Sequence, residues 1–78
     1  MADVNARFQW LSSSGGLIPS NAIPGGYARS GEPLYIGRVS HKGHMICGKI
    51  HPSHKALYVP HAGKEHAYHS GYEILVRN

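Results

Sequence analysis

Apolar and polar residues alternate with a period of two over several short segments of this chain, which is the spacing of β-strands. Residues 34–39 and 45–50 are rich in β-branched and aromatic side chains, which favour strands. Further strands are expected at residues 8–11, 56–59 and 71–76, and no window has the apolar spacing of an amphipathic helix. The pattern predicts an all-β fold, a small antiparallel sheet or barrel-like module of five or six short strands.

Turn-forming residues separate these segments. Prolines and glycines between residues 17 and 31 exclude a long helix, so this stretch is expected to be irregular or to hold very short strands. Residues 40–44 are expected to form a hairpin loop with Gly43 in a left-handed conformation. Pro60 is expected to end a strand, and residues 62–71 to form a loop with ionisable side chains.

The chain has 78 residues, enough for one domain. We expect residues 1–6 to be a flexible N-terminus and residues 7–78 to form a single domain. The single cysteine, Cys47, cannot form an internal disulfide and is expected to be a small buried apolar residue. The start of the chain lacks a signal-peptide pattern, and no segment approaches the ~20 apolar residues of a membrane span. These features predict a cytoplasmic protein and leave open export by a non-classical route.

Basic residues outnumber acidic ones, and the formal net charge is +4. This charge would suit a nucleic acid, and aromatic side chains could stack on bases. However, the basic residues are scattered along the chain, as on an ordinary solvated surface. Tyr35, Tyr58 and Tyr72 lie in expected strands, where packing in the core is the commoner role. No specific nucleic acid partner is predicted.

Signatures of catalysis are absent from the sequence. There is no serine nucleophile elbow and no glycine-rich phosphate loop. Of the four carboxylates, Asp3, Glu32, Glu65 and Glu73, no two are placed by the sequence on either side of a glycosidic bond, as hydrolysis of a glycoside requires. We therefore expect no enzyme activity and no cofactor.

Seven histidines include three pairs that share one spacing. On a helix, this spacing could place two imidazoles on one face and form half of a zinc site. In an extended strand, however, residues three apart point to opposite faces, so the pairs are not expected to bind a metal. The three pairs are His41 and His44, His51 and His54, and His66 and His69.

Several short motifs follow one another in a fixed order along the chain. They are Trp10, Ile18-Pro-Ser-Asn-Ala-Ile23, Gly26-Tyr27, Leu34-Tyr-Ile-Gly-Arg-Val39, Ile46-Cys-Gly-Lys49, Ala62-Gly-Lys-Glu-His66 and Tyr72-Glu-Ile-Leu75. In this order they resemble the DM-nine repeat, a small invertebrate β-module whose best-understood members are mannose-binding lectins and immune-recognition proteins. The resemblance implies binding of mannose-type glycans in innate-immune recognition, without a metal or cofactor.

The resemblance also implies where a sugar would bind. A hexose presents hydroxyls that both donate and accept, so a site needs an ammonium beside a carboxylate. In mannose-binding relatives a lysine of the Pro-Gly-Lys strand, here Lys49, pairs with an acid just after Gly-Tyr, where this chain has Ala28. Glu65 or Glu32 is therefore expected to supply the carboxylate, and the backbone around Tyr27 and Ala28 to form the floor.

Alternatives to this site remain open. His66 and Glu65 lie in the distinctive pentapeptide and are expected either to contact the ligand or to tie down the loop through backbone hydrogen bonds. Trp10 and the Tyr27 side chain are expected to serve in packing. Because Ala28 replaces the usual acid, the module could also be a non-catalytic protein-interaction domain that has lost sugar binding.

Members of the family usually carry two repeats in tandem, whereas this sequence resembles one. A lone β-module of this size leaves sheet edges and faces uncovered. We therefore expect a two-fold homodimer, in which a second copy takes the place of the missing repeat.

Overall fold

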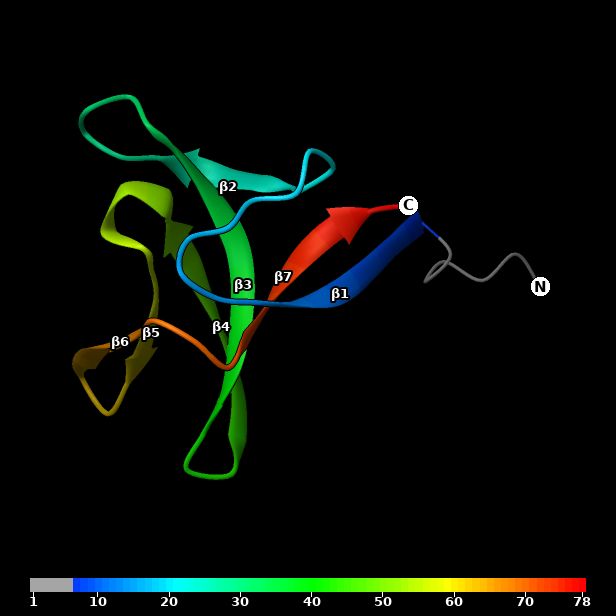
Figure 1. Cartoon of the computed structure of the whole chain (residues 1–78). Helices are drawn as coiled ribbons and strands as arrows, with labels where there is room; N and C mark the ends of the chain where they lie inside the picture. The colour runs from blue at the N-terminus through cyan, green and yellow to red at the C-terminus, as the bar shows by residue number, and fades with distance from the viewer. Residues whose placement is uncertain (1–6) are drawn as a thin grey trace.

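The computed structural model describes residues 7–78, which form one antiparallel sheet of seven strands (Figure 1). The segment expected to be a flexible N-terminus, residues 1–6, lies outside the described residues. Within residues 7–78 no helix is long and apolar enough to cross a membrane. The elements, in order, are β1 (Phe8–Ser13), β2 (Pro24–Tyr27), β3 (Pro33–His41), β4 (His44–His51), the 3-10 turn η2 (Pro52–His54), β5 (Ala56–His61), β6 (Lys64–Tyr68) and β7 (Tyr72–Arg77).

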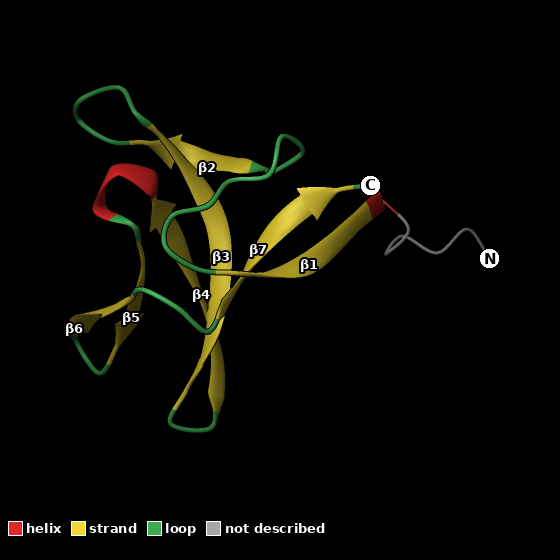
Figure 2. Ribbon diagram, in the orientation of Figure 1, coloured by secondary structure: helices red, strands yellow, loops and turns green. Residues whose placement is uncertain are grey.

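The predicted all-β, antiparallel fold is confirmed, and strands dominate the ribbon (Figure 2). The strand order is β1-β7-β3-β4-β5-β6, and β2 pairs with the first residues of β3. The sheet is not closed into a barrel, because no pairing joins the two ends of this order, β1 and β6, in the described part of the chain. The barrel-like alternative is therefore wrong, and so is the count of five or six strands.

One strand lies where a loop was expected, and another extends past its expected end. Residues 62–71 hold β6, because Ala62 and Gly63 reverse the chain within two residues, with φ of 52° and 75°. Pro60 does not end β5 but lies within it, opposite Glu65. A proline without an N–H is tolerated there because β4 pairs with β5 only as far as Tyr58.

The hairpin between β3 and β4 is tighter than the expected loop of residues 40–44. Only Lys42 and Gly43 lie between the paired residues His41 and His44. Their φ values of 51° and 84° match the two left-handed residues of a type I′ turn, which suits the twist of the flanking strands. The expected left-handed conformation of Gly43 is confirmed.

The core lies on one face of the sheet. Its members come from β3, β4, β5 and β7, and the segment between β1 and β2 packs against it through Ile18 and Ala22. The hydroxyl of Tyr72 accepts a hydrogen bond of 3.0 Å from the N–H of Gly16, which fastens this segment to the sheet. Cys47, expected to be buried, is exposed instead, because its side chain points away from the core. The core residues are Val39, Ile50, Leu57, Val59, Tyr72, Ile74 and Val76.

Two glycines allow the central strands to approach closely. Gly37 and Gly48 are opposite each other on β3 and β4. A Cβ added to Gly48 would lie 2.0 Å from the carbonyl oxygen of Tyr58, which is backbone and cannot rotate away. A Cβ on Gly37 would instead meet the ends of flexible side chains, at 2.8 Å from Ile50 Cδ1. Only glycine at position 48 therefore allows the backbone of β5 to lie this close to β4.

We expect Gly48→Ala to destabilise the protein by about 1–3 kcal/mol or more, because β4 and β5 must separate to admit the methyl group. Urea unfolding followed by circular dichroism measures the change. The control is Gly37→Ala, whose neighbours can change rotamer, and it should cost less. Equal free energies of unfolding for wild type and Gly48→Ala would contradict the close approach.

Candidate functional site

A depression of about 730 Å³ lies on the face of the sheet opposite the core. Its volume falls in the range of about 300–1,000 Å³ typical of small-ligand sites. Lys49 and Glu65, which the sequence placed in one site, both line this depression. The full lining consists of Leu34, Cys47, Gly48, Lys49, His51, His54, Tyr58, Val59, Pro60, Gly63, Lys64 and Glu65.

Strand alternation explains why these side chains share a face. Lys49 pairs with Tyr58 across β4 and β5, and paired residues in a ladder point to the same side. Ile50 and Leu57, the next pair, are fully buried on the core side. Each change of one residue along a strand changes the face, so a buried Ile50 directs Lys49 outward.

The Lys49 ammonium extends across β3 to the glycines of β2. A Cβ placed on Gly26 would lie 3.2 Å from Lys49 Nζ, so a side chain at this position would crowd the ammonium. The φ of Gly26, 149°, is also one that other residues rarely adopt. Within residues 7–78 the ammonium forms no ion pair or hydrogen bond, and its donors face solvent.

Glu32 borders this site, but its carboxylate is already bound. Oε2 accepts from the backbone N–H of Ser53 at 2.8 Å, and Oε1 accepts from the Ser53 hydroxyl at 2.7 Å. Nε2 of His51 lies 2.7 Å from the same Oε1. The Ser53 hydroxyl first, and then its N–H and His51, hold the pKa of Glu32 below its usual range. The residue joins the β2–β3 connection to η2, which leaves Glu65 as the acceptor that lines the depression.

Two imidazoles and a phenol form one wall of the depression. The rings of His51 and His54 stack at 3.6 Å between centroids with an interplanar angle of 13°. His54 Nδ1 and the Tyr58 hydroxyl share a hydrogen bond of 2.9 Å. The expectation that histidines three apart point to opposite faces is wrong here, because the chain turns into η2 at Pro52. This wall was missed, although a proline after His51 does signal the end of the strand.

The residues expected to form the floor, Tyr27 and Ala28, are not among those that line the depression. Tyr27 is 72% exposed, so the expected packing role of its side chain is wrong. Ala28 closes the turn between β2 and β3: its N–H donates to the carbonyl of Glu32 at 2.8 Å. Trp10 does have a packing role, because the guanidinium of Arg38 lies 4.3 Å from the centre of its ring.

Comparison with known proteins identifies the family of this chain. The family model of the DM9 repeat matches residues 2–68. The chain belongs to the DM9 repeat family. A similar protein is Natterin-3 from Thalassophryne nattereri, which is 35% identical over 72 residues, or 92% of this chain. The match covers 17% of Natterin-3, so this DM9 repeat spans about a sixth of that relative's length.

His66, expected near the ligand, lies on the core side of the sheet and not in the depression. It joins a cluster of rings at the tips of the β3–β4 and β5–β6 hairpins, where its centroid is 4.4 Å from that of His41. The ring of His61 is 4.8 Å from that of His41, and His44 is 6.1 Å from His61. His41 and His44 were expected on opposite faces, but the two-residue turn makes them cross-strand partners.

His41 is the buried member of this cluster, at 7% exposure. Its Nδ1 is hydrogen-bonded to the Tyr68 hydroxyl, and its Nε2 has no partner among the described groups. In residues 7–78, no three histidine, cysteine or acidic side chains are arranged to hold a metal ion. Burial first, and then the positive charge that His66, His61, Lys42 and His44 can carry, lower the pKa of His41.

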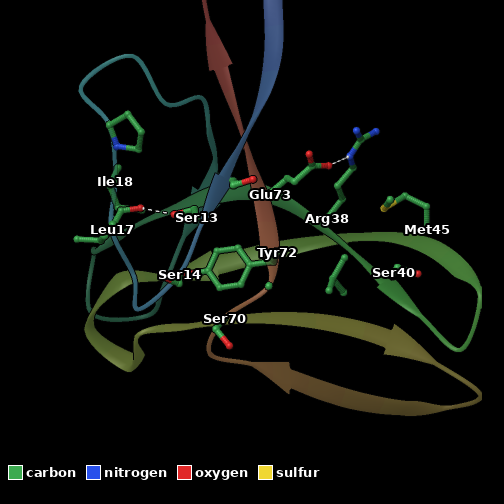
Figure 3. Close-up of a pocket in the computed structure, with 14 residues that line it drawn as sticks. Ser13, Ser14, Leu17, Ile18, Arg38, Ser40, Met45, Ser70, Tyr72 and Glu73 are labelled. Carbon is green, nitrogen blue, oxygen red and sulfur yellow. Dashed lines mark hydrogen bonds and ion pairs between the residues drawn. The ribbon is translucent and has the colours of Figure 1, made fainter.

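A second, larger depression of about 1010 Å³ lies between the segment after β1 and strands β3 and β7 (Figure 3). Leu17 and Met45 line it and are exposed. Its charged side chains satisfy each other, since Arg38 Nε donates to Glu73 Oε1 at 2.7 Å. With its charges paired, this hollow offers less to a polar ligand than the one at Lys49.

The lowered pKa of His41 predicts how the stability of the protein changes with pH. In the unfolded chain the imidazole of His41 binds a proton near its ordinary pKa of about 6.5. In the folded state the same imidazole binds a proton less readily. Stability is therefore complete above that pH and falls as the pH drops from about 6.5 towards the folded pKa. The melting temperature of wild type should decrease between pH 7.5 and 5.

The variant His41→Gln should have a lower melting temperature than wild type at pH 7.5. Its melting temperature should decrease less than that of wild type when the pH is lowered to 5. Exposed His69→Gln, which leaves the cluster intact, is the matched control and should follow the wild-type curve. An unchanged pH dependence in His41→Gln would show that His41 is not the group responsible.

Proposed function

We propose that this DM9 repeat is a non-catalytic lectin that binds mannose-type glycans in the depression at Lys49. The observation that carries the proposal is the combination of an unpaired ammonium, a carboxylate and an aromatic wall in one hollow. Sugar hydroxyls need donors and acceptors, and the apolar C–H face of a sugar ring packs on flat aromatic surfaces. Family membership supports the same function.

Each side chain has a distinct role in this proposal. Lys49 donates to the hydroxyls of one sugar unit, and Glu65 accepts from hydroxyls at the other end. The stacked imidazoles of His51 and His54, beside Tyr58, support the sugar that lies between Lys49 and Glu65. Neither step breaks a bond, so the proposal requires no catalytic group.

The distance between Lys49 and Glu65 favours a glycan longer than one sugar. Lys49 pairs with Tyr58, which pairs with Ala67, so Glu65 is two strands away and two residues along. Standard strand spacings separate the two Cα atoms by about 12 Å. A disaccharide or larger glycan end would span this distance. Recognition of such glycans on microbial or damaged cells is the biological role we propose.

A protein-interaction module without sugar binding is the second candidate. Ala28, at the position where the resemblance places an acid, favours it, because its methyl group cannot accept a hydrogen bond. A glycan array with the purified protein separates the candidates: the lectin binds mannose-terminated glycans, and the interaction module binds none.

We expect Lys49→Ala to weaken binding of mannose-type glycans at least tenfold. A hydrogen bond to a charged group contributes about 1.5–3 kcal/mol, and a tenfold loss corresponds to about 1.4 kcal/mol. Calorimetric titration in a buffer with chelator measures the affinity. Lys42→Ala removes an equal charge from the β3–β4 turn, away from the depression, and should bind like wild type. Unchanged affinity of folded Lys49→Ala would remove this residue from the site.

We also propose that the protein is a homodimer. The outer edges of β1 and β6 have no strand partner in the described residues, and an unpaired edge is a surface for association. Two sites in one particle would raise avidity by about 10²–10⁴ when both reach the glycan surface. We expect light scattering after gel filtration to give twice the 8.5 kDa of one chain. A monodisperse 8.5 kDa species at low micromolar concentration would refute the dimer.

A further inference from the structure

We propose that the Lys49 end of the depression binds an acidic group, so that the preferred glycan carries a carboxylate, phosphate or sulfate. The inference rests on the proposed lectin function and names the class of ligand that the site takes. It follows from where the acidic side chains of this chain lie.

Each of the three described carboxylate side chains is either bound elsewhere or far from the Lys49 ammonium. Glu73 is paired with Arg38 at 2.7 Å. Glu32 uses its two oxygens for Ser53 and His51. Glu65 lies at the other end of the hollow, about 12 Å away between Cα atoms by strand spacing. No acidic group within residues 7–78 therefore balances the charge of Lys49.

The surroundings of the ammonium also favour an anion. Gly26 has no side chain, and a Cβ there would lie 3.2 Å from Nζ, so no side chain at this position of β2 covers the charge. Ala28, two residues further along the same segment, offers only a methyl group. Lys64 also lines the hollow, at the Glu65 end, and adds positive charge at longer range. The formal charge of the chain, +4, attracts anions from a distance as well.

A neutral hydroxyl would accept only one hydrogen bond from this ammonium and leave its charge unbalanced. An anionic oxygen forms a shorter and stronger bond with the same donor, roughly twice as strong as a neutral pair. We therefore expect a glycan with an acidic group to bind at least tenfold more tightly than its neutral counterpart. Carboxylate, phosphate and sulfate groups all present an anionic oxygen to the ammonium. The experiment below distinguishes a glycan that carries a carboxylate from one that carries a phosphate.

The test compares matched ligands by calorimetric titration of the intact chain at pH 7.5. The ligands are mannose, mannose 6-phosphate, mannuronate and inorganic phosphate. We expect mannose to bind weakly, and one or both acidic sugars to bind at least tenfold more tightly at about 50 mM salt, with the gain shrinking at about 500 mM. Inorganic phosphate should bind more weakly than the phosphorylated sugar; equal binding would overturn the inference, because the sugar would then contribute nothing.

Variants locate the effect. Lys49→Gln should bind acidic and neutral sugars alike, whereas Lys42→Gln, with the same loss of charge, should keep the preference. Ala28→Asp should reduce the preference by placing a carboxylate near the ammonium. Circular dichroism and melting temperature establish that each variant is folded. A preference that persists in Lys49→Gln would overturn the assignment to this residue.

The failure of the inference and that of the lectin proposal have different signatures. Mannose that binds as tightly as both acidic sugars would overturn the acidic-group inference and leave the lectin proposal standing. No binding of any glycan, neutral or acidic, on an array would overturn the lectin proposal together with the inference.

Discussion

The close approach of β5 to β4 at Gly48 is the constraint on which the two faces of this molecule depend. Because no Cβ lies between the strands, the Tyr58 carbonyl can pass above position 48. The ladder that follows buries Ile50 and Leu57 on one side and presents Lys49 and Tyr58 on the other. The same contact therefore fixes the depth of the core and the position of the ammonium in the depression.

Five of the strands could be predicted because their residues carry the signal themselves, and the first of them, β1, was indicated by alternation over residues 8–11. β3, β4, β5 and β7 combine β-branched or aromatic residues with alternation, and their inward side chains form the core. β2 was covered only by the expectation of very short strands between residues 17 and 31, since it contains two glycines, and β6 was not predicted, since it is rich in polar residues. Both are held by neighbours, β3 and β5, and a sequence pattern does not record which neighbour a segment will meet.

The candidate site was only partly predictable for the same reason. Lys49 and Glu65 belong to short motifs, and they line one depression. The hydrogen bonds of the Glu32 carboxylate depend on Ser53, which lies twenty-one residues later and is turned towards Glu32 by η2. The stacking of His51 on His54 also depends on that turn. His66 was placed near the ligand because it adjoins Glu65, but adjacent residues of a strand point to opposite faces.

The pairing of Phe8 with Arg77 places the start of the first strand beside the end of the last strand, as the ribbon shows for β1 and β7 (Figure 1). A module whose ends meet can be inserted into a surface loop of a host protein as a single closed unit. It could also be circularly permuted, with a short linker across this pair and new ends at the Lys42–Gly43 turn. Neither change would touch the strands that carry Lys49 and Glu65. The paired residues at the two chain ends, Phe8 and Arg77, do not line the depression that holds Lys49 and Glu65.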